Sequence, residues 1–212
     1  MQLVSEDINQ YCETHTTAET PVLFELNRQT HLNVMQPRML SGHLQGAFLS
    51  MISHMLKPLN VLEIGTFTGY SAICLAAGIQ PEGKLHTIEI NEEFSEMISS
   101  YIAEAGLENL IVQHKGDAID IIPGLSEQFD LVFIDADKVN YARYYDLVFD
   151  KVNPGGYIIA DNVLWSGKVI NQTKDKDTEA LDMYNKKIMA DERVENVLLP
   201  MRDGLMIARK IE

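Results

Sequence analysis

The chain is poor in cysteine and has no long apolar run. Its 212 residues include two cysteines, Cys12 and Cys74, and Cys74 lies in the apolar segment SAICLAA, which favours a reduced core thiol over a disulfide. No run reaches the ~18 apolar residues that a membrane span needs. The opening MQLVSEDINQ lacks the basic and apolar regions of a secretory signal. We therefore expect a cytoplasmic protein with no membrane partner.

Basic residues are also scarce. Lysine and arginine number 17 against 31 acids, which gives a formal net charge of -14. Phosphate backbones and anionic lipids would repel such a chain, and this argues against general nucleic-acid binding. Five lysines near the C-terminal third could still form a local basic patch: Lys168, Lys174, Lys176, Lys186 and Lys187.

Apolar spacing predicts helices first and alternating elements afterwards. Segments 5–16, 17–34 and 41–56 have helical spacing, and the last places Leu44, Phe48, Met51, Ile52 and Met55 on one face. Strands are predicted at 61–65, 84–90, 110–115, 129–135, 155–161, 193–200 and 205–212. Helices are predicted between the first five strands, at 71–79, 92–106, 118–125 and 141–152.

This order predicts an α/β fold. Strand–helix alternation implies parallel strands covered by helices on both faces, and the MRDG turn predicts a closing hairpin. We expect a Rossmann-like, doubly wound, mostly parallel seven-stranded sheet with a C-terminal antiparallel strand. The whole chain, 1–212, is expected to be one domain, with N-terminal helices at 1–58 and the core at 59–212.

The turn after the first strand, EIGTFTGYSA, indicates a nucleoside cofactor other than a dinucleotide. Its spacing is G-x-x-x-G rather than G-x-G-x-x-G, which argues against a nicotinamide dehydrogenase. Glu63 would repel a pyrophosphate but would suit the cationic S-adenosylmethionine. Glu89 can accept two ribose hydroxyls, and Asp117 with the Ala118 amide can read adenine. The alternative is that these acids are only exposed strand ends.

A second polar cluster follows the fourth and fifth predicted strands. Asp135 and the Asp161–Asn162 pair should converge, because adjacent parallel strands lie ~4.8 Å apart. Two carboxylates and an amide oxygen suit Mg²⁺ or Ca²⁺ better than Zn²⁺. Asp161–Asn162 could instead be a simple turn. The six histidines share no spacing, and we interpret them as surface or helix residues.

Several stretches together resemble a known family. These are LEIGTFTGYS, TIEIN, GDAIDIIP, FDLVFIDADKVNY, NPGGYIIADNVLWSGKV and PMRDGLMIARK, which extend from about Met39 to the C-terminus. The chain resembles the class I S-adenosylmethionine-dependent, metal-dependent O-methyltransferases of the caffeoyl-CoA and catechol group. IDADK with ADNVLW is the specific part of this match.

The resemblance implies roles for particular residues. It places a divalent cation (Mg²⁺, or else Mn²⁺ or Ca²⁺) on Asp135, Asp161 and Asn162, the catalytic base at Lys138, and the acceptor pocket at Trp165 and Ser166. It places the cofactor on Ser41, Glu63, Gly65, Thr66, Ser71, Glu89, Ala118, Asp135 and Asp137. It also implies a homodimer. The first forty residues and INQTKDKDTEA depart from the family, in regions that shape acceptor choice.

We therefore expect methyl transfer to one hydroxyl of a vicinal, catechol-like aromatic diol. Asp135 and Lys138 are the expected catalytic residues. Two alternatives stay open. One is methylation of a hydroxylated tRNA uridine, which the lysine patch would support if it is contiguous. The other is a non-catalytic S-adenosylmethionine-binding module, against which the presence of Lys138 beside all three metal ligands argues.

Overall fold

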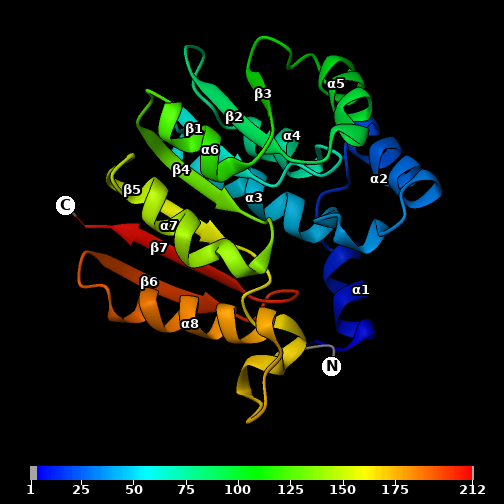
Figure 1. Cartoon of the computed structure of the whole chain (residues 1–212). Coiled ribbons are helices and arrows are strands. Elements are labelled where there is room, and N and C mark those ends of the chain that lie inside the picture. The colour runs from blue at the N-terminus through cyan, green and yellow to red at the C-terminus, as the bar shows by residue number, and fades with distance from the viewer. Residues whose placement is uncertain (1–3, 212) are drawn as a thin grey trace.

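A twisted sheet runs through the middle of the molecule. The computed structural model describes residues 4–211, and within them the sheet has seven strands in the order β3-β2-β1-β4-β5-β7-β6 (Figure 1). They are β1 (Asn60–Ile64), β2 (Lys84–Glu89), β3 (Ile111–Lys115), β4 (Phe129–Ile134), β5 (Val152–Ala160), β6 (Val194–Leu199) and β7 (Leu205–Lys210). The first five are parallel, and β7 is antiparallel to both neighbours. The predicted fold class is confirmed.

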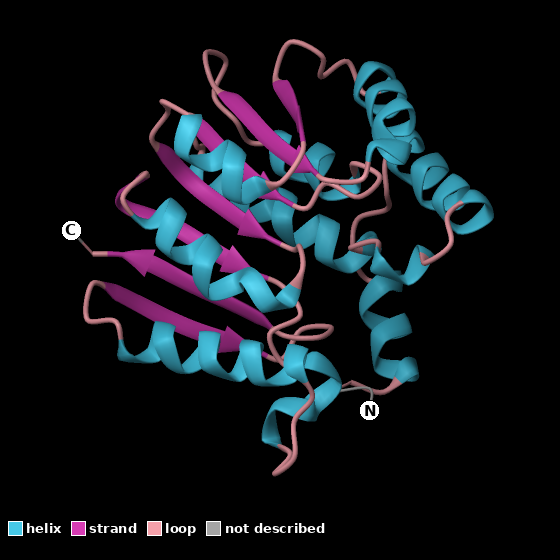
Figure 2. Cartoon of the chain, viewed as in Figure 1, coloured by secondary structure: helices cyan, strands magenta, loops and turns pink. Residues whose placement is uncertain are grey.

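Helices cover both faces of this sheet (Figure 2). They are α1 (Glu6–Thr14), α2 (Pro21–Asn33), α3 (Gly42–Leu56), α4 (Tyr70–Ala76), α5 (Ser95–Glu104), α6 (Ala118–Ile121), α7 (Tyr141–Phe149) and α8 (Lys176–Ala190). The α8 segment was not predicted as a helix or strand from the sequence. None of the helices within residues 4–211 combines the length and apolarity needed to cross a membrane.

Alternate side chains of each central strand enter two different cores. On β4, Leu131 and Phe133 pack with the cluster that includes α2, α3, α4 and α5, whereas Val132 and Ile134 pack with α6, α7 and α8. This is the period-two alternation of a strand buried on both faces. Cys74 is buried with a free thiol, as predicted.

Helix α3 buries a different face from the one that its apolar residues suggest. Its fully buried positions include Gln45, Leu49 and Ser53, whereas Met51 and Met55 are exposed. The polar pair can be buried because each has a partner: Gln45 donates to Asp161, and Ser53 donates to the Leu75 carbonyl. A buried polar group that keeps a hydrogen bond loses little free energy. These two partners therefore allow α3 to bury a face that its apolar residues alone do not indicate.

Two histidines lie on strands, which corrects their interpretation as surface or helix residues. His86 on β2 is buried, and its Nδ1 lies 3.0 Å from Nε2 of His114 on β3. The two rings stack with their centroids 5.2 Å apart. Both histidines fall within the predicted strands 84–90 and 110–115, so their strand placement was available from the sequence; only their contact, across 28 residues, depends on strand pairing.

Candidate active site

The carboxyl ends of the parallel strands bring the predicted polar residues to one edge of the sheet. The strand registers place Ile64, Ile134 and Ala160 side by side on β1, β4 and β5. The pattern continues past the strands: the Asp135 amide donates to the Ile64 carbonyl (2.8 Å), and the Asp161 amide donates to the Ile134 carbonyl (2.9 Å). Asp135 and Asp161 therefore lie on neighbouring strand ends, as the sequence predicted.

The glycine turn after β1 is shaped by this edge. Gly65 has φ +97°, and a Cβ there would lie 2.1 Å from the Asp135 carbonyl oxygen. Any other side chain would separate the ends of β1 and β4. Gly69, at φ +96°, precedes the first residue of α4. Both glycines of G-x-x-x-G are thus required by backbone geometry.

Glu63 is completely buried beneath this turn. Its Oε2 accepts a hydrogen bond from the Thr87 hydroxyl (2.5 Å), while Oε1 has no partner within residues 4–211. Burial raises the pKa of Glu63 to about 8, and the Ser71 and Thr87 hydroxyls oppose this rise. With this pKa the carboxyl is mostly protonated at neutral pH, and a cationic group placed against it would favour its ionised form.

Three further predicted cofactor residues are buried close to Glu63 and along the start of α3. Thr66 and Ser71 are 2% and 6% exposed, and the Thr66 hydroxyl lies 2.5 Å from that of Thr87. Ser41 is 6% exposed at the start of α3, and its carbonyl accepts a hydrogen bond from Arg202. These side chains form part of the wall around the strand ends.

Glu89 and Asp117 are tied to the backbone at the ends of β2 and β3. Glu89 accepts the amides of Phe67 (2.7 Å) and Asn91 (2.8 Å), one on each oxygen. Asp117 caps α6 by accepting the Ile119 amide (2.8 Å), and Ala118 is buried directly after it. Because each carboxylate oxygen has two lone pairs, Glu89 keeps capacity for two further donors in a fixed orientation.

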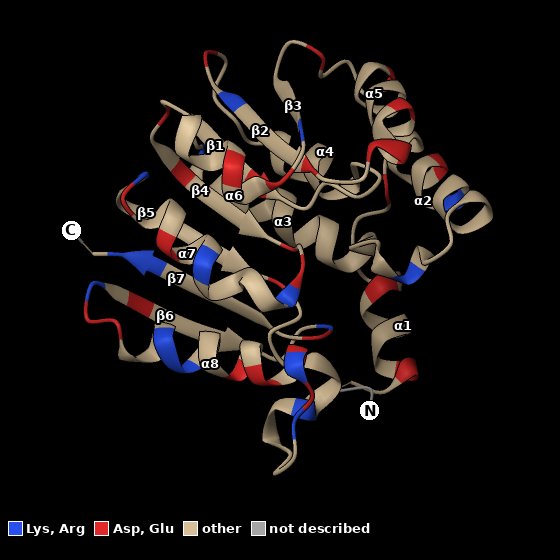
Figure 3. Cartoon of the chain, in the orientation of Figure 1, with Lys and Arg blue, Asp and Glu red and all other residues tan. Residues whose placement is uncertain are grey.

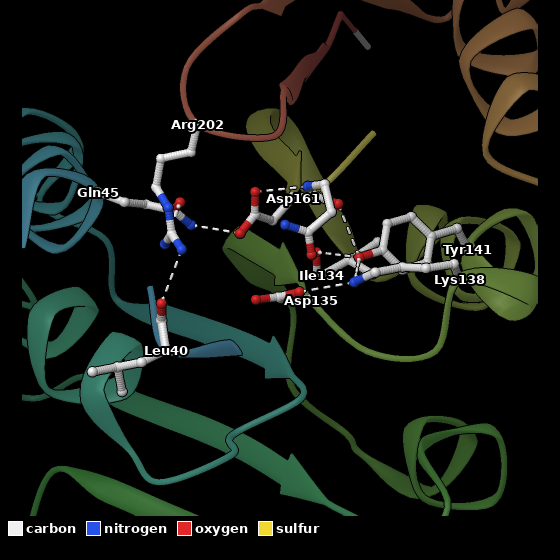
Figure 4. A network of polar contacts seen from close by, with 9 residues as sticks. Leu40, Gln45, Ile134, Asp135, Lys138, Tyr141, Asp161 and Arg202 are labelled. Atoms are coloured by element: carbon white, nitrogen blue, oxygen red, sulfur yellow. Dashed lines mark hydrogen bonds and ion pairs between the residues drawn. The ribbon is translucent and has the colours of Figure 1, made fainter. Parts of the chain in front are cut away.

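Lys138 lies at one side of the acid cluster, between Asp135 and Tyr141 (Figure 4). Its Nζ donates to Asp135 Oδ1 (2.9 Å) and to the Tyr141 hydroxyl (2.7 Å). Both members of the ion pair are largely buried, with side chains 11% and 17% exposed. Asp137 does not pair with Lys138: its carboxylate accepts hydrogen bonds from Tyr144 and Asn140. Tyr141, which the sequence analysis missed, holds the lysine in place.

Asp161 is buried and has a partner on each carboxylate oxygen. Oδ1 accepts the Asn162 amide (2.6 Å), and Oδ2 accepts Nε2 of Gln45 (2.7 Å). Burial, and then the Asp135 carboxylate, raise the pKa of Asp161, while Gln45, Arg202 and Lys138 lower it. Asn162 has the left-handed φ of +60°, which Asn tolerates better than most residues. The backbone thus turns sharply at the predicted metal ligands.

The predicted acceptor residues form a kinked loop over this cluster. Trp165 and Ser166 both have positive φ, 46° and 56°. The Ser166 amide donates to the Asp203 carboxylate, and Nζ of Lys138 lies 5.9 Å from the Trp165 ring centroid. The loop therefore lies near the lysine and is anchored to the β6–β7 turn.

The side chains predicted to bind a metal offer oxygen atoms, which are the ligands that a hard divalent cation prefers. Among residues 4–211, no group of three or more His, Cys, Asp or Glu side chains is placed to hold a metal ion. Asp135, Asp161 and Asn162 offer two carboxylates and an amide instead. Burial, and then the nearby Asp135 carboxylate, raise the pKa of Asp161, and a bound cation would favour the ionised form of both acids.

The five lysines do not form a free basic patch (Figure 3). Four of them pair with acids: Lys168 with Asp175, Lys174 and Lys186 with Asp182, and Lys187 with Asp146. Paired charges of opposite sign attract a phosphate backbone weakly. The pairing makes these lysines less favourable to a tRNA substrate than five free lysines would be.

Comparisons with known proteins agree with this geometry. The sequence model of an O-methyltransferase family matches residues 13–211. The chain belongs to this O-methyltransferase family. The resemblance to class I S-adenosylmethionine-dependent O-methyltransferases is thereby confirmed, and the protein is an enzyme.

Individual relatives cover most of the chain. Caffeoyl-CoA O-methyltransferase 2 from Populus trichocarpa is 34% identical over 181 residues, which are 79% of this chain and 73% of the relative. An O-methyltransferase from Bacillus cereus, solved with SAH, is 30% identical with a TM-score of 0.89, covering 96% of this chain and 97% of the other. TomG from Streptomyces achromogenes, solved with SAM, is 29% identical with a TM-score of 0.89, covering 97% and 96%.

Proposed function

We propose that this O-methyltransferase transfers the methyl group of S-adenosylmethionine to one hydroxyl of a vicinal aromatic diol, with the help of a divalent cation. The observation that carries the proposal is the convergence of Asp135, Asp161 and Lys138 at one edge of the sheet, with a 2.9 Å ion pair between Lys138 and Asp135. These residues combine an all-oxygen ligand set with a group that can move a proton.

The cofactor part of the proposal is supported by the charge of the glycine turn. Glu63 has one unpartnered carboxyl oxygen in a fully buried position, which would take the ammonium group of the cofactor. Glu89, held by two backbone amides, would accept the ribose hydroxyls, and Asp117 with Ala118 would bind adenine. Solved relatives with 29% and 30% identity contain SAM and SAH.

The chemical step is an in-line displacement. The bond between the methyl carbon and the sulfonium sulfur breaks, the sulfur keeps the electron pair, and a carbon–oxygen bond forms. A phenol is a poor nucleophile because its pKa is near 10. Lys138 first releases to solvent the proton that it donates to Asp135, and the neutral amine then takes the hydroxyl proton at Nζ and becomes an ammonium again, while Tyr141 keeps Nζ in place.

Asp135, Asp161 and Asn162 would hold the divalent cation. When bound, it would supply the Lewis acidity that favours the ionised hydroxyl of the acceptor. Trp165 and Ser166 would line the acceptor pocket and help to exclude water. A homodimer also belongs to the proposal, supported by exposed apolar side chains on the N-terminal helices, among them Tyr11, Phe24 and Leu32.

A methyl-transfer assay over matched acceptors tests the proposal. Catechol should be methylated, resorcinol, whose hydroxyls are not vicinal, much less so, and tRNA not at all. Activity should be lost with EDTA and return with Mg²⁺ or Mn²⁺. Asp161→Ala should abolish turnover while cofactor binding persists. Full activity in excess chelator would contradict the metal requirement, and methylation of tRNA alone would contradict the acceptor class.

A further inference from the structure

Gln45 and Arg202 form a polar chain that ends on Asp161 (Figure 4). Arg202 Nη1 donates to Gln45 Oε1 (3.1 Å), and Gln45 Nε2 donates to Asp161 Oδ2 (2.7 Å). Gln45 is completely buried, on α3, whereas Arg202 is partly exposed in the β6–β7 turn. Neither residue was predicted from the sequence to belong to the site.

The chemistry of the three groups allows one orientation of the Gln45 amide. An arginine has donors only, and an ionised carboxylate has acceptors only. Gln45 must therefore turn its oxygen to Arg202 and its nitrogen to Asp161. Because the Asn162 amide holds the other oxygen of Asp161 (2.6 Å), the carboxylate is fixed on both sides. Its rotation is set before any cation binds.

Arg202 has a second set of partners, on the backbone that precedes α3. Its Nη2 donates to the Leu40 carbonyl (3.0 Å), and its Nη1 also donates to the Ser41 carbonyl. One guanidinium thus spans the start of α3, where Ser41 is a proposed cofactor residue, and the amide that holds Asp161. The planar fork of Arg can meet several acceptors at fixed angles, which a Lys ammonium cannot do.

The same turn also holds the acceptor loop. Next to Arg202, the Asp203 carboxylate accepts the Ser166 amide, and the Asp203 carbonyl accepts the Leu164 amide (2.9 Å). Arg202 has φ +49°, in the left-handed region. Strained residues persist only where their surroundings hold them, and here three hydrogen bonds do so.

We propose that Gln45 and Arg202 are positioning residues: Gln45 orients Asp161 for a divalent cation, and Arg202 orients Gln45 while fixing the Leu40–Ser41 wall of the cofactor site. The inference rests on the proposed function, since it assigns both residues to that same site. It predicts that the two residues differ in what their loss affects. Loss of Gln45 should weaken binding of the cation alone, whereas loss of Arg202 should weaken binding of both the cation and the cofactor.

The test measures two affinities directly on the purified protein. Mn²⁺ binding is followed by the EPR signal of the free ion, and S-adenosylhomocysteine binding by calorimetry. Gln45→Leu should weaken Mn²⁺ binding about ten- to a hundredfold, the usual effect of removing a partner of a metal ligand, and leave the nucleoside affinity unchanged. Arg202→Gln should weaken both. Arg202→Lys should behave like Arg202→Gln, because the fork is lost although the charge remains.

Matched controls separate these effects from general damage. Arg209→Gln removes an arginine of β7 that pairs with Glu195, and Gln113→Leu removes a glutamine of β3 that contacts Ser99. Both should retain wild-type affinities. Melting temperatures show whether each variant is folded. Should Gln45→Leu not fold, the two Arg202 variants, at a partly exposed position, decide the question.

The outcomes separate this inference from the proposed function. Wild-type protein that binds no Mn²⁺ would overturn both. Wild-type protein that binds Mn²⁺ while Gln45→Leu binds it equally well would overturn only the role of Gln45. Unchanged nucleoside affinity in Arg202→Gln, or wild-type behaviour of Arg202→Lys, would overturn the role of the guanidinium fork.

Discussion

Lys138 is held between an acid and a phenol. Its Nζ contacts Asp135 Oδ1 and the Tyr141 hydroxyl, and the Tyr141 hydroxyl in turn lies 3.0 Å from the Asp161 carbonyl oxygen. An exposed ion pair contributes roughly 0–1 kcal/mol. This pair is largely enclosed, with 11% and 17% of its side chains exposed, and it lies at the strand ends where the acceptor is proposed to bind.

Replacement of Lys138 distinguishes a base from a simple ion-pair partner. Lys138→Ala should lower kcat for catechol by at least about a hundredfold, because a general base contributes about 10²–10⁴. The deficit should shrink for a nitrocatechol, whose hydroxyl is already acidic. Lys138→Arg keeps the charge but cannot act as a base, so it should be equally impaired.

Lys187→Ala serves as the control, since Lys187 forms an ion pair with Asp146 on the surface. A loss under threefold in Lys138→Ala would assign Lys138 a purely electrostatic role. An equal loss across acceptors of different acidity would instead indicate that it orients the substrate.

At the scale of elements, the β2–β3 pair contains a buried titratable contact. Burial lowers the pKa of His86 and of His114 below the ordinary value of 6.5, and Glu127 opposes this in both cases. Below about pH 6.5 the unfolded chain binds protons that the folded chain resists. The free energy of unfolding should therefore fall as the pH is lowered through this range.

His86→Phe tests this pH dependence. The variant keeps an aromatic ring against Phe129, which meets His86 edge-on at 5.9 Å, but cannot titrate. Urea unfolding between pH 7.5 and 5.5 should show a shallower loss of stability than in the wild type. His54→Phe, at an exposed position of α3, should keep the wild-type slope. An unchanged slope in His86→Phe would show that the pair does not govern acid sensitivity.

At the scale of the whole molecule, the acidic Glu63 and the glycine turn after β1 favour a cationic nucleoside cofactor over a dinucleotide. S-adenosylhomocysteine at a hundred times its Kd should stabilise the protein by about 2.7 kcal/mol, or roughly 5–10 °C in Tm for a chain of this size. Glu89→Ala should reduce the shift, and Glu104→Ala, at an exposed position of α5, should not. Stabilisation by NAD without any effect of the nucleoside would show the cofactor assignment to be wrong.

The sequence by itself determined where the strands lie, how they alternate with helices along the chain, and which polar residues follow their ends. Each predicted strand overlaps an observed one, because period-two apolar patterns and glycine turns act over a few neighbouring residues. The convergence of Asp135 and Asp161 followed from parallel strand geometry alone. Helix α8 carried a local signal that was not used: the Asp175 cap and the spacing of Leu181, Tyr184 and Ile188.

Only the tertiary structure decided which face of α3 is buried and which residues hold Asp161. Gln45 lies 116 residues from Asp161, and Arg202 lies 157 residues from Gln45. A glutamine in an apolar helix is usually placed on the exposed side, and it can be buried only where the fold supplies partners for both ends of its amide. Such partners come from packing between distant segments, on which the local pattern carries no information.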